Sequence, residues 1–217
     1  MCPAADEGSV SKPQIYRVTR NSLRDADPPR HLLEDIDTLI PNAGLLPRQV
    51  AKMILPREDR LWLLLFASGL PDRLCLAFAR ICALRCLTFW LVPHPAIVVR
   101  YLRTGKKALA REAREAVVPL MGDAEKAAAW AATVPFFEGD SINLVLRRWM
   151  IVSAPYRAWA AAASARKAGI SGEDQISDLL SVMDMHPTVL ALRVSGGYFD
   201  ALSDNPVPGS RKGGRGR

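Results

Sequence analysis

Aromatic side chains are scarce in this sequence. They make up 7% of its 217 residues, whereas apolar residues together reach 49%. Thirty positions are alanine and twenty-seven are leucine, and both residues are strong helix formers. A β-sandwich would need many more aromatic and β-branched side chains, and a wholly disordered chain could not contain so much apolar surface. The composition therefore predicts an all-α fold, a single helical bundle-like domain.

A secretory signal is also missing from the opening segment MCPAADEGSVSKPQIYRVTR, which is polar and interrupted by proline. The first apolar run, residues 60–70, is too short to cross a bilayer. The second, residues 74–92, contains Arg80 and Arg85, each costing about 2.5 to 3.5 kcal/mol near a bilayer centre. We therefore expect a cytoplasmic protein, free or peripheral at the inner face of the inner membrane, with this run as a central helix.

Four cysteines are present, and three of them fall in the second apolar run at Cys75, Cys82 and Cys86. On a helix these three lie within about 40° of one another, but the outer two are roughly 16 Å apart along the axis. One metal ion cannot bind all three, and no second Cys or His pair follows at zinc-binding spacing. We expect the thiols to pack in the core, with no metal and no cofactor. Arg73 and Arg80 are predicted on the opposite face, reaching solvent or a partner.

Motifs for catalysis are absent. His31, His94 and His186 are far apart in sequence, and no G-x-S-x-G segment is present. The segment RTGKKA lacks the upstream glycine of a phosphate-binding loop. We therefore predict no catalytic residues and no enzymatic activity.

Proline and glycine divide the chain into three parts. Residues 1–30 are polar and end at a proline pair, which predicts a flexible N-terminal arm. Residues 31–203 form the helical domain, and residues 204–217 form a disordered basic tail, whose last seven residues supply +4 of the net charge of +7. Residues 188–199 are compatible with either strand or helix. Helices are expected at 31–40, 48–55, 58–68, 74–92, 96–103, 106–118, 124–134 and 176–185. Residues 141–169 are expected to form one helix with a bend near Pro155, or two abutting helices.

Basic residues of the domain are expected to gather into one patch. Its predicted members are Arg100, Arg103, Lys106, Lys107, Arg147 and Arg148. Trp149 lies beside them, with Tyr156 and Trp159 further along, and such aromatic residues are typical of interface anchors when exposed and of the core when buried. The patch is compatible with a solvated face, with a protein partner, or with nucleic acid, to which the tail would add salt-sensitive affinity.

Two segments resemble known families. The apolar run RLWLLLFASGLPDRLCLAFARICALRCLTF, followed by YLRTGKKALAREAREAVVPLMGDAEKAAA, resembles the K-subunit family of bacterial type III secretion systems over about residues 55–130. That family, linked to virulence and nodulation, implies a non-enzymatic adaptor between the cytosolic sorting platform and the inner-membrane ring. The segment AEKAAAWAATVPFFEGDS is also similar to an uncharacterised Ala-rich helical bacterial domain, which implies no activity.

Overall fold

All regular elements of the described chain are helices. The computed structural model describes residues 15–90, 92–117, 119–120, 122–132 and 153–184, and within these ranges a single antiparallel bridge joins Val18 to Leu45. The predicted all-α domain is confirmed. The first half of the predicted arm, residues 188–199 and the tail lie outside the described residues.

Three helices form the centre of the molecule: α6 (Asp72–Arg85), α9 (Asp123–Ala132) and α11 (Ala154–Lys167), with α11 packed against both of the others. Their contacts are rich in alanine, which allows helix backbones to approach closely. The buried alanines of these helices are Ala77, Ala79, Ala83, Ala124, Ala127, Ala128, Ala131, Ala132, Ala154, Ala158, Ala160, Ala161, Ala162 and Ala165. The high alanine content, which predicted a helical fold, thus also allows the central helices to pack closely.

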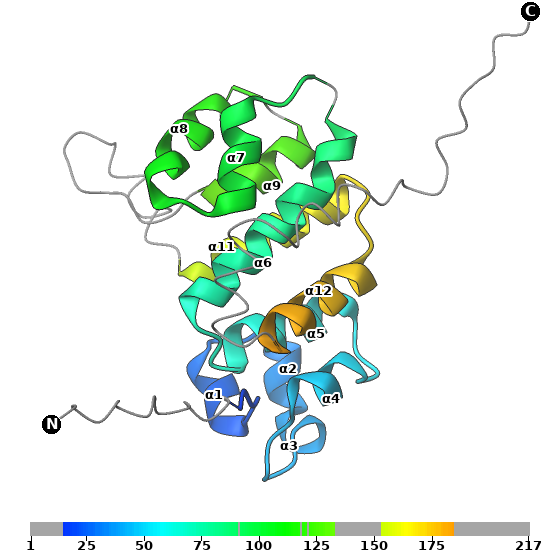
Figure 1. The fold of residues 1–217 in the computed structure, drawn as a ribbon. Coiled ribbons are helices and arrows are strands. Elements are labelled where there is room, and N and C mark those ends of the chain that lie inside the picture. Colours follow the sequence, from blue (N-terminus) through cyan, green and yellow to red (C-terminus); the bar gives the residue numbers. More distant parts are fainter. Residues whose placement is uncertain (1–14, 91, 118, 121, 133–152, 185–217) are drawn as a thin grey trace, which may run out of the picture.

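A helical hairpin covers one end of this centre (Figure 1). It consists of α7 (Ala96–Thr104) and α8 (Lys107–Val117), which pack on each other, while α7 also contacts α6 and both contact α9. The buried hydroxyl of Tyr101 donates a hydrogen bond of 2.7 Å to the carbonyl of Ala131, tying α7 to α9. The hairpin is therefore fixed to the centre by a polar contact as well as by apolar packing.

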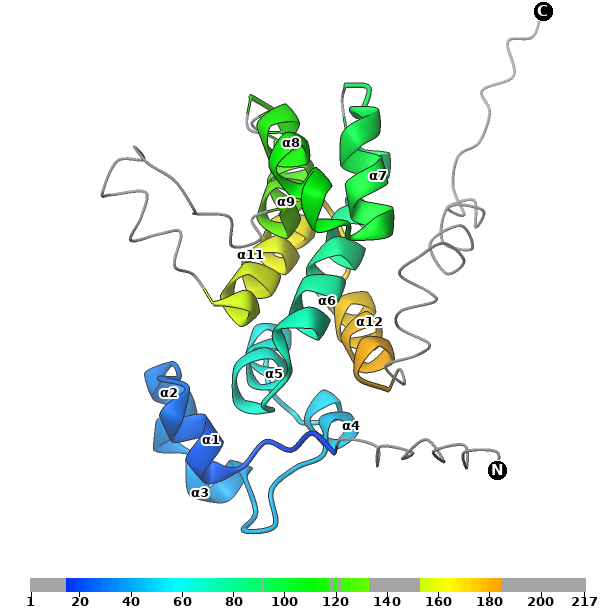
Figure 2. The same ribbon diagram turned by 60° about the vertical axis from the view of Figure 1, so that its left-hand side comes forward.

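Short helices cover the opposite end. They are α1 (Arg20–Asp25), α2 (Arg30–Glu34), α3 (Ile36–Leu39), α4 (Pro47–Ala51) and α5 (Arg57–Trp62), which continues as a π-helical turn, η1 (Leu63–Ala67). A 3-10 turn, η2 (Cys86–Phe89), similarly extends α6. Figure 2 shows α1, α2 and α3 as one group at the end of the molecule away from α7 and α8. The proline-bounded segments of the sequence thus become short helices, as predicted.

The N-terminal segment is more ordered than predicted. Thr19 caps α1 through its side chain, Val18 exchanges backbone hydrogen bonds with Leu45, and Leu23 is fully buried. The prediction of a flexible arm is wrong for residues 15–30, because a capped helical turn and two buried apolar side chains bind this segment to the domain.

The thiols are in the core, as predicted. Cys75, Cys82 and Cys86 are buried and unbridged, and burial raises the pKa of Cys75 and of Cys86 to about 12. Among the described residues no group of three potential metal ligands comes together. The three thiols thus fill space between helices in the manner of small apolar side chains.

The apolar run 74–92 forms α6 and η2, and within the described chain no helix has the length and apolarity needed to cross a membrane. Arg73 is exposed, as predicted, but Arg80 is only 6% exposed. The expectation that Arg80 reaches solvent is wrong, because α7 and its C-terminal turn pack over this part of α6.

The last described helix, α12 (Gly172–Asp184), is attached by ion pairs to three other helices. Asp184 accepts from Arg48 of α4 at 2.7 Å, and Glu173 accepts from Arg60 of α5 at 2.6 Å. Asp178 pairs with Arg85 of α6 in a two-pronged contact of 2.5 and 2.7 Å. Pro155 occupies the first turn of α11, where its missing N–H costs nothing. Residues 141–152 of the predicted range lie outside the described residues, so the prediction of one bent helix or two abutting ones stays a prediction.

Candidate functional site: a basic turn between two helices

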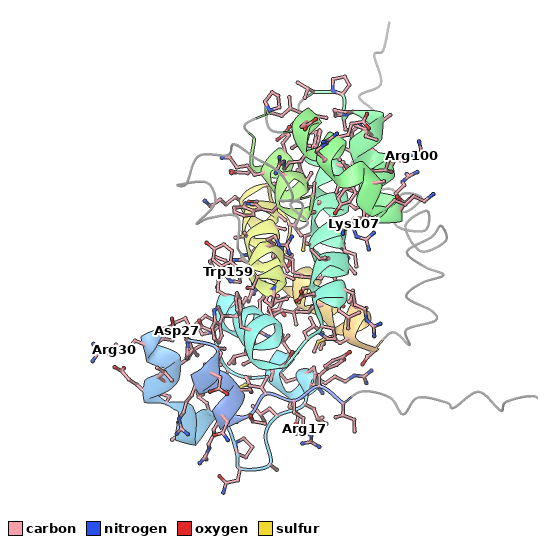
Figure 3. All side chains as sticks on the ribbon, turned by 90° about the vertical axis from the view of Figure 1, so that its left-hand side faces the viewer. Arg17, Asp27, Arg30, Arg100, Lys107 and Trp159 are labelled. Atoms are coloured by element: carbon pink, nitrogen blue, oxygen red, sulfur yellow. The ribbon has the colours of Figure 1, made fainter. Side chains whose placement is uncertain are left out.

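Four of the seven predicted site residues come together at the α7–α8 turn. Arg100 and Arg103 lie in the last two turns of α7, Lys106 lies in the turn, and Lys107 begins α8. All four are exposed. Figure 3 labels Arg100 and Lys107 on this hairpin, at the opposite end of the molecule from Arg17 and Arg30. We call these four residues the basic turn.

The other three predicted residues, Arg147, Arg148 and Trp149, lie outside the described residues. Their proximity to the basic turn therefore stays a prediction. Trp159, grouped with them in the sequence, packs against the core, with its ring 6.0 Å from that of Tyr156. The core interpretation of Trp159 is favoured, since its indole nitrogen is itself buried.

Local sequence explains the shape of the turn. α7 ends at Thr104. Its C-cap, Gly105, has a left-handed φ of 62° and donates its N–H to the carbonyl of Tyr101 at 2.7 Å. The Thr104 hydroxyl donates to the carbonyl of Arg100 at 2.7 Å and accepts from the N–H of Lys106 at 3.3 Å. Glycine is the residue that adopts this conformation without strain. The segment RTGK thus ends one helix and starts the next within two residues.

The basic turn is not neutralised at every position. Arg100 and Lys106 have no ion pair with any carboxylate of the described chain. By contrast, Arg111 and Glu115 form an i, i+4 pair on α8, with Nε and Oε1 3.9 Å apart. The turn therefore presents excess positive charge, whereas the middle of α8 is nearly balanced.

Arg80 of α6 adds a fifth cation directly beneath the turn. Its guanidinium packs against Gly105 so closely that a Cβ at residue 105 would overlap Nη1. Among the described residues this buried Nη1 has no hydrogen-bond partner, and burial lowers the pKa of Arg80. Sequence reasoning placed this residue at the surface, because arginine side chains are mostly exposed. The one available signal of burial was its position inside an apolar run.

Gly105→Ala is expected to lower the free energy of unfolding by about 2 kcal/mol, because the new Cβ is strained at a left-handed φ and also displaces the Arg80 guanidinium. Gly69 provides a matched control, since its φ is 71° and nothing lies within 4 Å of its would-be Cβ. Gly69→Ala should therefore show the backbone strain alone, about 1 kcal/mol. Urea unfolding measures both, and equal losses would contradict the packing of Arg80 on Gly105.

The described histidines do not form a common site. His31 Nε2 lies 3.0 Å from Asp59 Oδ2 at the α2–α5 contact, whereas the His94 ring lies 5.8 Å from that of Trp90, ahead of α7. His186 lies outside the described residues. His31 therefore serves the contact between two short helices, at the end of the molecule away from the basic turn.

Comparisons of the chain with protein-family models, with curated proteins and with solved structures find no match.

Proposed function

We propose that the protein is a non-enzymatic cytoplasmic adaptor that binds an acidic surface of a partner protein through the basic turn. The observation that carries the proposal is the exposure of Arg100, Arg103, Lys106 and Lys107 on one rigid hairpin. Charged groups arranged in this way speed the encounter with a partner of opposite charge and select against partners of like charge. The hairpin is fixed to the central helices, so that these charges keep a defined arrangement.

The partners that we propose are components of a type III secretion apparatus, namely the cytosolic sorting platform and the cytoplasmic domains of the inner-membrane ring. The resemblance to the K-subunit family supports this assignment. It covers about residues 55–130, which include α5 to α9 and therefore the whole basic turn. The adaptor would bridge these two assemblies at the inner face of the membrane.

A paired charge reversal tests the adaptor proposal. Arg100→Glu with Lys106→Glu should weaken capture of the platform and ring components at least about tenfold at physiological salt, since each reversal replaces attraction by repulsion. Arg24→Glu with Lys52→Glu changes the net charge equally, but at exposed residues of α1 and after α4. This control should bind as the unchanged protein does. Dissociation constants from surface-immobilised partners give the comparison.

Two results would overturn the adaptor proposal. One is the absence of any capture of the secretion components by the unchanged protein at physiological salt. The other is an equal loss of binding in both charge-reversed variants, since that would reflect net charge and not the basic turn.

Nucleic acid is the second candidate, favoured by the same cluster of cations. A phosphate backbone binds lysine and arginine with affinity that falls steeply as salt rises. Retardation of DNA or RNA that survives deletion of residues 207–217 and disappears in the Arg100→Glu, Lys106→Glu variant would support this function. Retardation that disappears with the deletion alone would assign it to the tail.

A further inference from the structure

The helix α12 is acidic, and the surface on which it lies is basic. α12 carries four carboxylates and no lysine or arginine. Three of these carboxylates form ion pairs with arginines of three other helices, namely Arg48 of α4, Arg57 and Arg60 of α5, and Arg85 of α6. We call the surface of α4, α5 and α6 that these four arginines mark the α12 docking surface. Complementary charge of this kind is typical of contacts between separate proteins, where it steers the encounter and fixes the orientation.

The apolar face of α12 has the spacing of a helix that docks on another protein. Ile176, Leu179 and Met183 follow one another at i, i+3 and i+7, and all three are buried. Amphipathic helices that bind a partner commonly use apolar anchors at this spacing. α12 lies beside α6 and also contacts α5 and α4 (Figure 2). The helix thus combines apolar anchors with carboxylates that mark its orientation.

The contact of α12 also differs from the contacts among the central helices. Those are made largely of buried alanines, which fit only when the helix backbones lie close together. The face that α12 buries includes polar Gln175 and Asp178 as well as the apolar anchors. Gln175 donates to the carbonyl of Ala162 at 2.8 Å and accepts from Arg166 at 3.1 Å. A mixture of apolar anchors, hydrogen bonds and charge pairs is typical of protein–protein interfaces that form and dissociate.

The ion pairs of α12 orient the helix more than they hold it. Both side chains are exposed in the pairs Arg48–Asp184 and Arg57–Glu173, so water and salt weaken the attraction. In the pair of Arg85 with Asp178, the cost of removing both groups from water offsets much of the attraction. Release of α12 would return these charges to water, and the main loss would be the contacts of a few apolar side chains.

We propose that α12 is a displaceable helix and that the α12 docking surface accepts, in its place, an acidic amphipathic helix of a partner protein. The partner helix would present apolar side chains at i, i+3 and i+7 and carboxylates where α12 has Glu173, Asp178 and Asp184. While α12 is docked, it closes this surface to the partner. Residues 168–171, which include Gly169 with a φ of 111°, connect α11 to α12 and act as the hinge.

Leu179→Glu is the informative variant, because it alters the helix and not the surface beneath it. Leu179 is fully buried, so a carboxylate there should drive α12 off its docking surface. A fluorescein-labelled peptide of residues 171–184 serves as the probe for the partner helix. It should bind the Leu179→Glu protein at least about tenfold more tightly than the unchanged protein, in which α12 competes. Ser177→Glu adds the same charge at an exposed residue and should bind the peptide as the unchanged protein does.

Two variant peptides test whether the arginines recognise the helix. Asp178→Lys places a like charge at the position that pairs with Arg85, and it should weaken binding to the Leu179→Glu protein at least about tenfold. The matched peptide carries Asp174→Lys, which has the same net charge but alters an exposed residue, so its loss of affinity should be far smaller. Fluorescence anisotropy at physiological salt measures all of these dissociation constants.

Two buried thiols report the release of α12 independently of the peptide. Burial raises the pKa of Cys82, and the Asp178 carboxylate raises it further, so this thiol lies near α12. The charged groups that affect Cys75 are Asp72 and Arg157, which belong to α6 and α11. Cys82 therefore reports on the contact with α12, and Cys75 serves as an internal control on the same helix.

Leu179→Glu should speed the reaction of Cys82 with N-ethylmaleimide at least about tenfold and leave Cys75 protected. Added peptide should slow the reaction of Cys82 again, because it covers the surface that α12 has left. Mass spectrometry after trypsin digestion gives the two rates separately, since cleavage after Arg80 places the two thiols in different peptides.

Three results would overturn the proposal. The first is that the two thiols respond alike to Leu179→Glu, since α12 would then not leave the core as a separate unit. The second is that the peptide binds the Leu179→Glu protein no better than the unchanged protein. The third is equal binding of the unmodified and the Asp178→Lys peptides. These outcomes are separate from those of the adaptor proposal, whose charge reversals lie on the α7–α8 hairpin and leave α12 and its docking surface unaltered (Figure 1).

Discussion

Replacing Arg85 by methionine is expected to lower the free energy of unfolding by about 3–5 kcal/mol at pH 7, the usual cost of breaking one side of a buried ion pair. Arg85 of α6 makes both of its contacts with Asp178 of α12, at 2.5 and 2.7 Å. The Asp178 side chain is 7% exposed, whereas that of Arg85 is 30% exposed. Removing the arginine therefore leaves a carboxylate in the core with no counter-charge. Chemical denaturation followed by circular dichroism measures the loss.

The loss in Arg85→Met should decrease as the pH falls. Burial raises the pKa of Asp178, and the Arg85 hydrogen bond opposes that rise. Without Arg85 the folded-state pKa rises further above the unfolded value. A carboxyl group of this kind favours the folded state when protonated, and this contribution is lost as the pH rises through the folded pKa. The variant should thus be closer to the unchanged protein at pH 5 than at pH 7.

Two controls separate a broken buried pair from a general loss of charge. The first control is Arg48→Met. It removes the partner of Asp184, which lies on α12 as Asp178 does but is exposed, so the loss of unfolding free energy should be far smaller than in Arg85→Met. Arg85→Met combined with Asp178→Leu removes both charges and should restore most of the stability, because no buried carboxylate is then left without its counter-charge. A loss at Arg48 as large as that at Arg85, or no recovery in the double variant, would refute this account.

Ala161→Leu is expected to cost about 3 kcal/mol, at the upper end for an overpacked core. Ala161 is fully buried on α11, which packs against both α6 and α9. A leucine there requires α11 to move away from its neighbours, and this would weaken the contacts of many alanines at once.

The matched control for this prediction is Ala163→Leu on the same helix. Ala163 is only partly buried, so a larger side chain can extend toward solvent. Both variants replace alanine by leucine within one helix, so the change in helix propensity is the same in each. A difference in stability between them therefore reports on packing. Similar unfolding midpoints for the two variants in guanidinium chloride would show that the alanine contacts do not set the helix spacing.

Local features of the fold followed from sequence because they depend on neighbouring residues. Gly169, the last residue of the predicted helical range 141–169, has a φ of 111° directly after α11 ends. Arg100 and Lys106 lie close together because only one turn separates their helices, and Arg111 pairs with Glu115 on one helix face. Such features are set by helical period and by glycine, so a linear pattern is sufficient to predict them.

The burial and the pairing of the two arginines in the apolar run could not be predicted from neighbouring residues. Arg80 and Arg85 are five residues apart on α6, yet Arg80 is buried against the α7–α8 turn, whereas Arg85 pairs with a residue 93 positions away. The N-terminal segment is similar, since the burial of Val18 depends on Leu45. Each outcome depends on which element packs over the residue, and this is not encoded within a window of neighbouring residues.

The composition of the chain and the positions of its prolines and glycines were thus enough to predict the helical class, the burial of the thiols and the basic character of one turn. These features arise from local conformational preference and from hydrophobicity. Folding in three dimensions decided that Arg80 lies beneath Gly105 and that Arg85 holds α12. The physical reason is that the cost of burying a charge depends on distances between segments remote in sequence, and these distances exist only once the helices have packed.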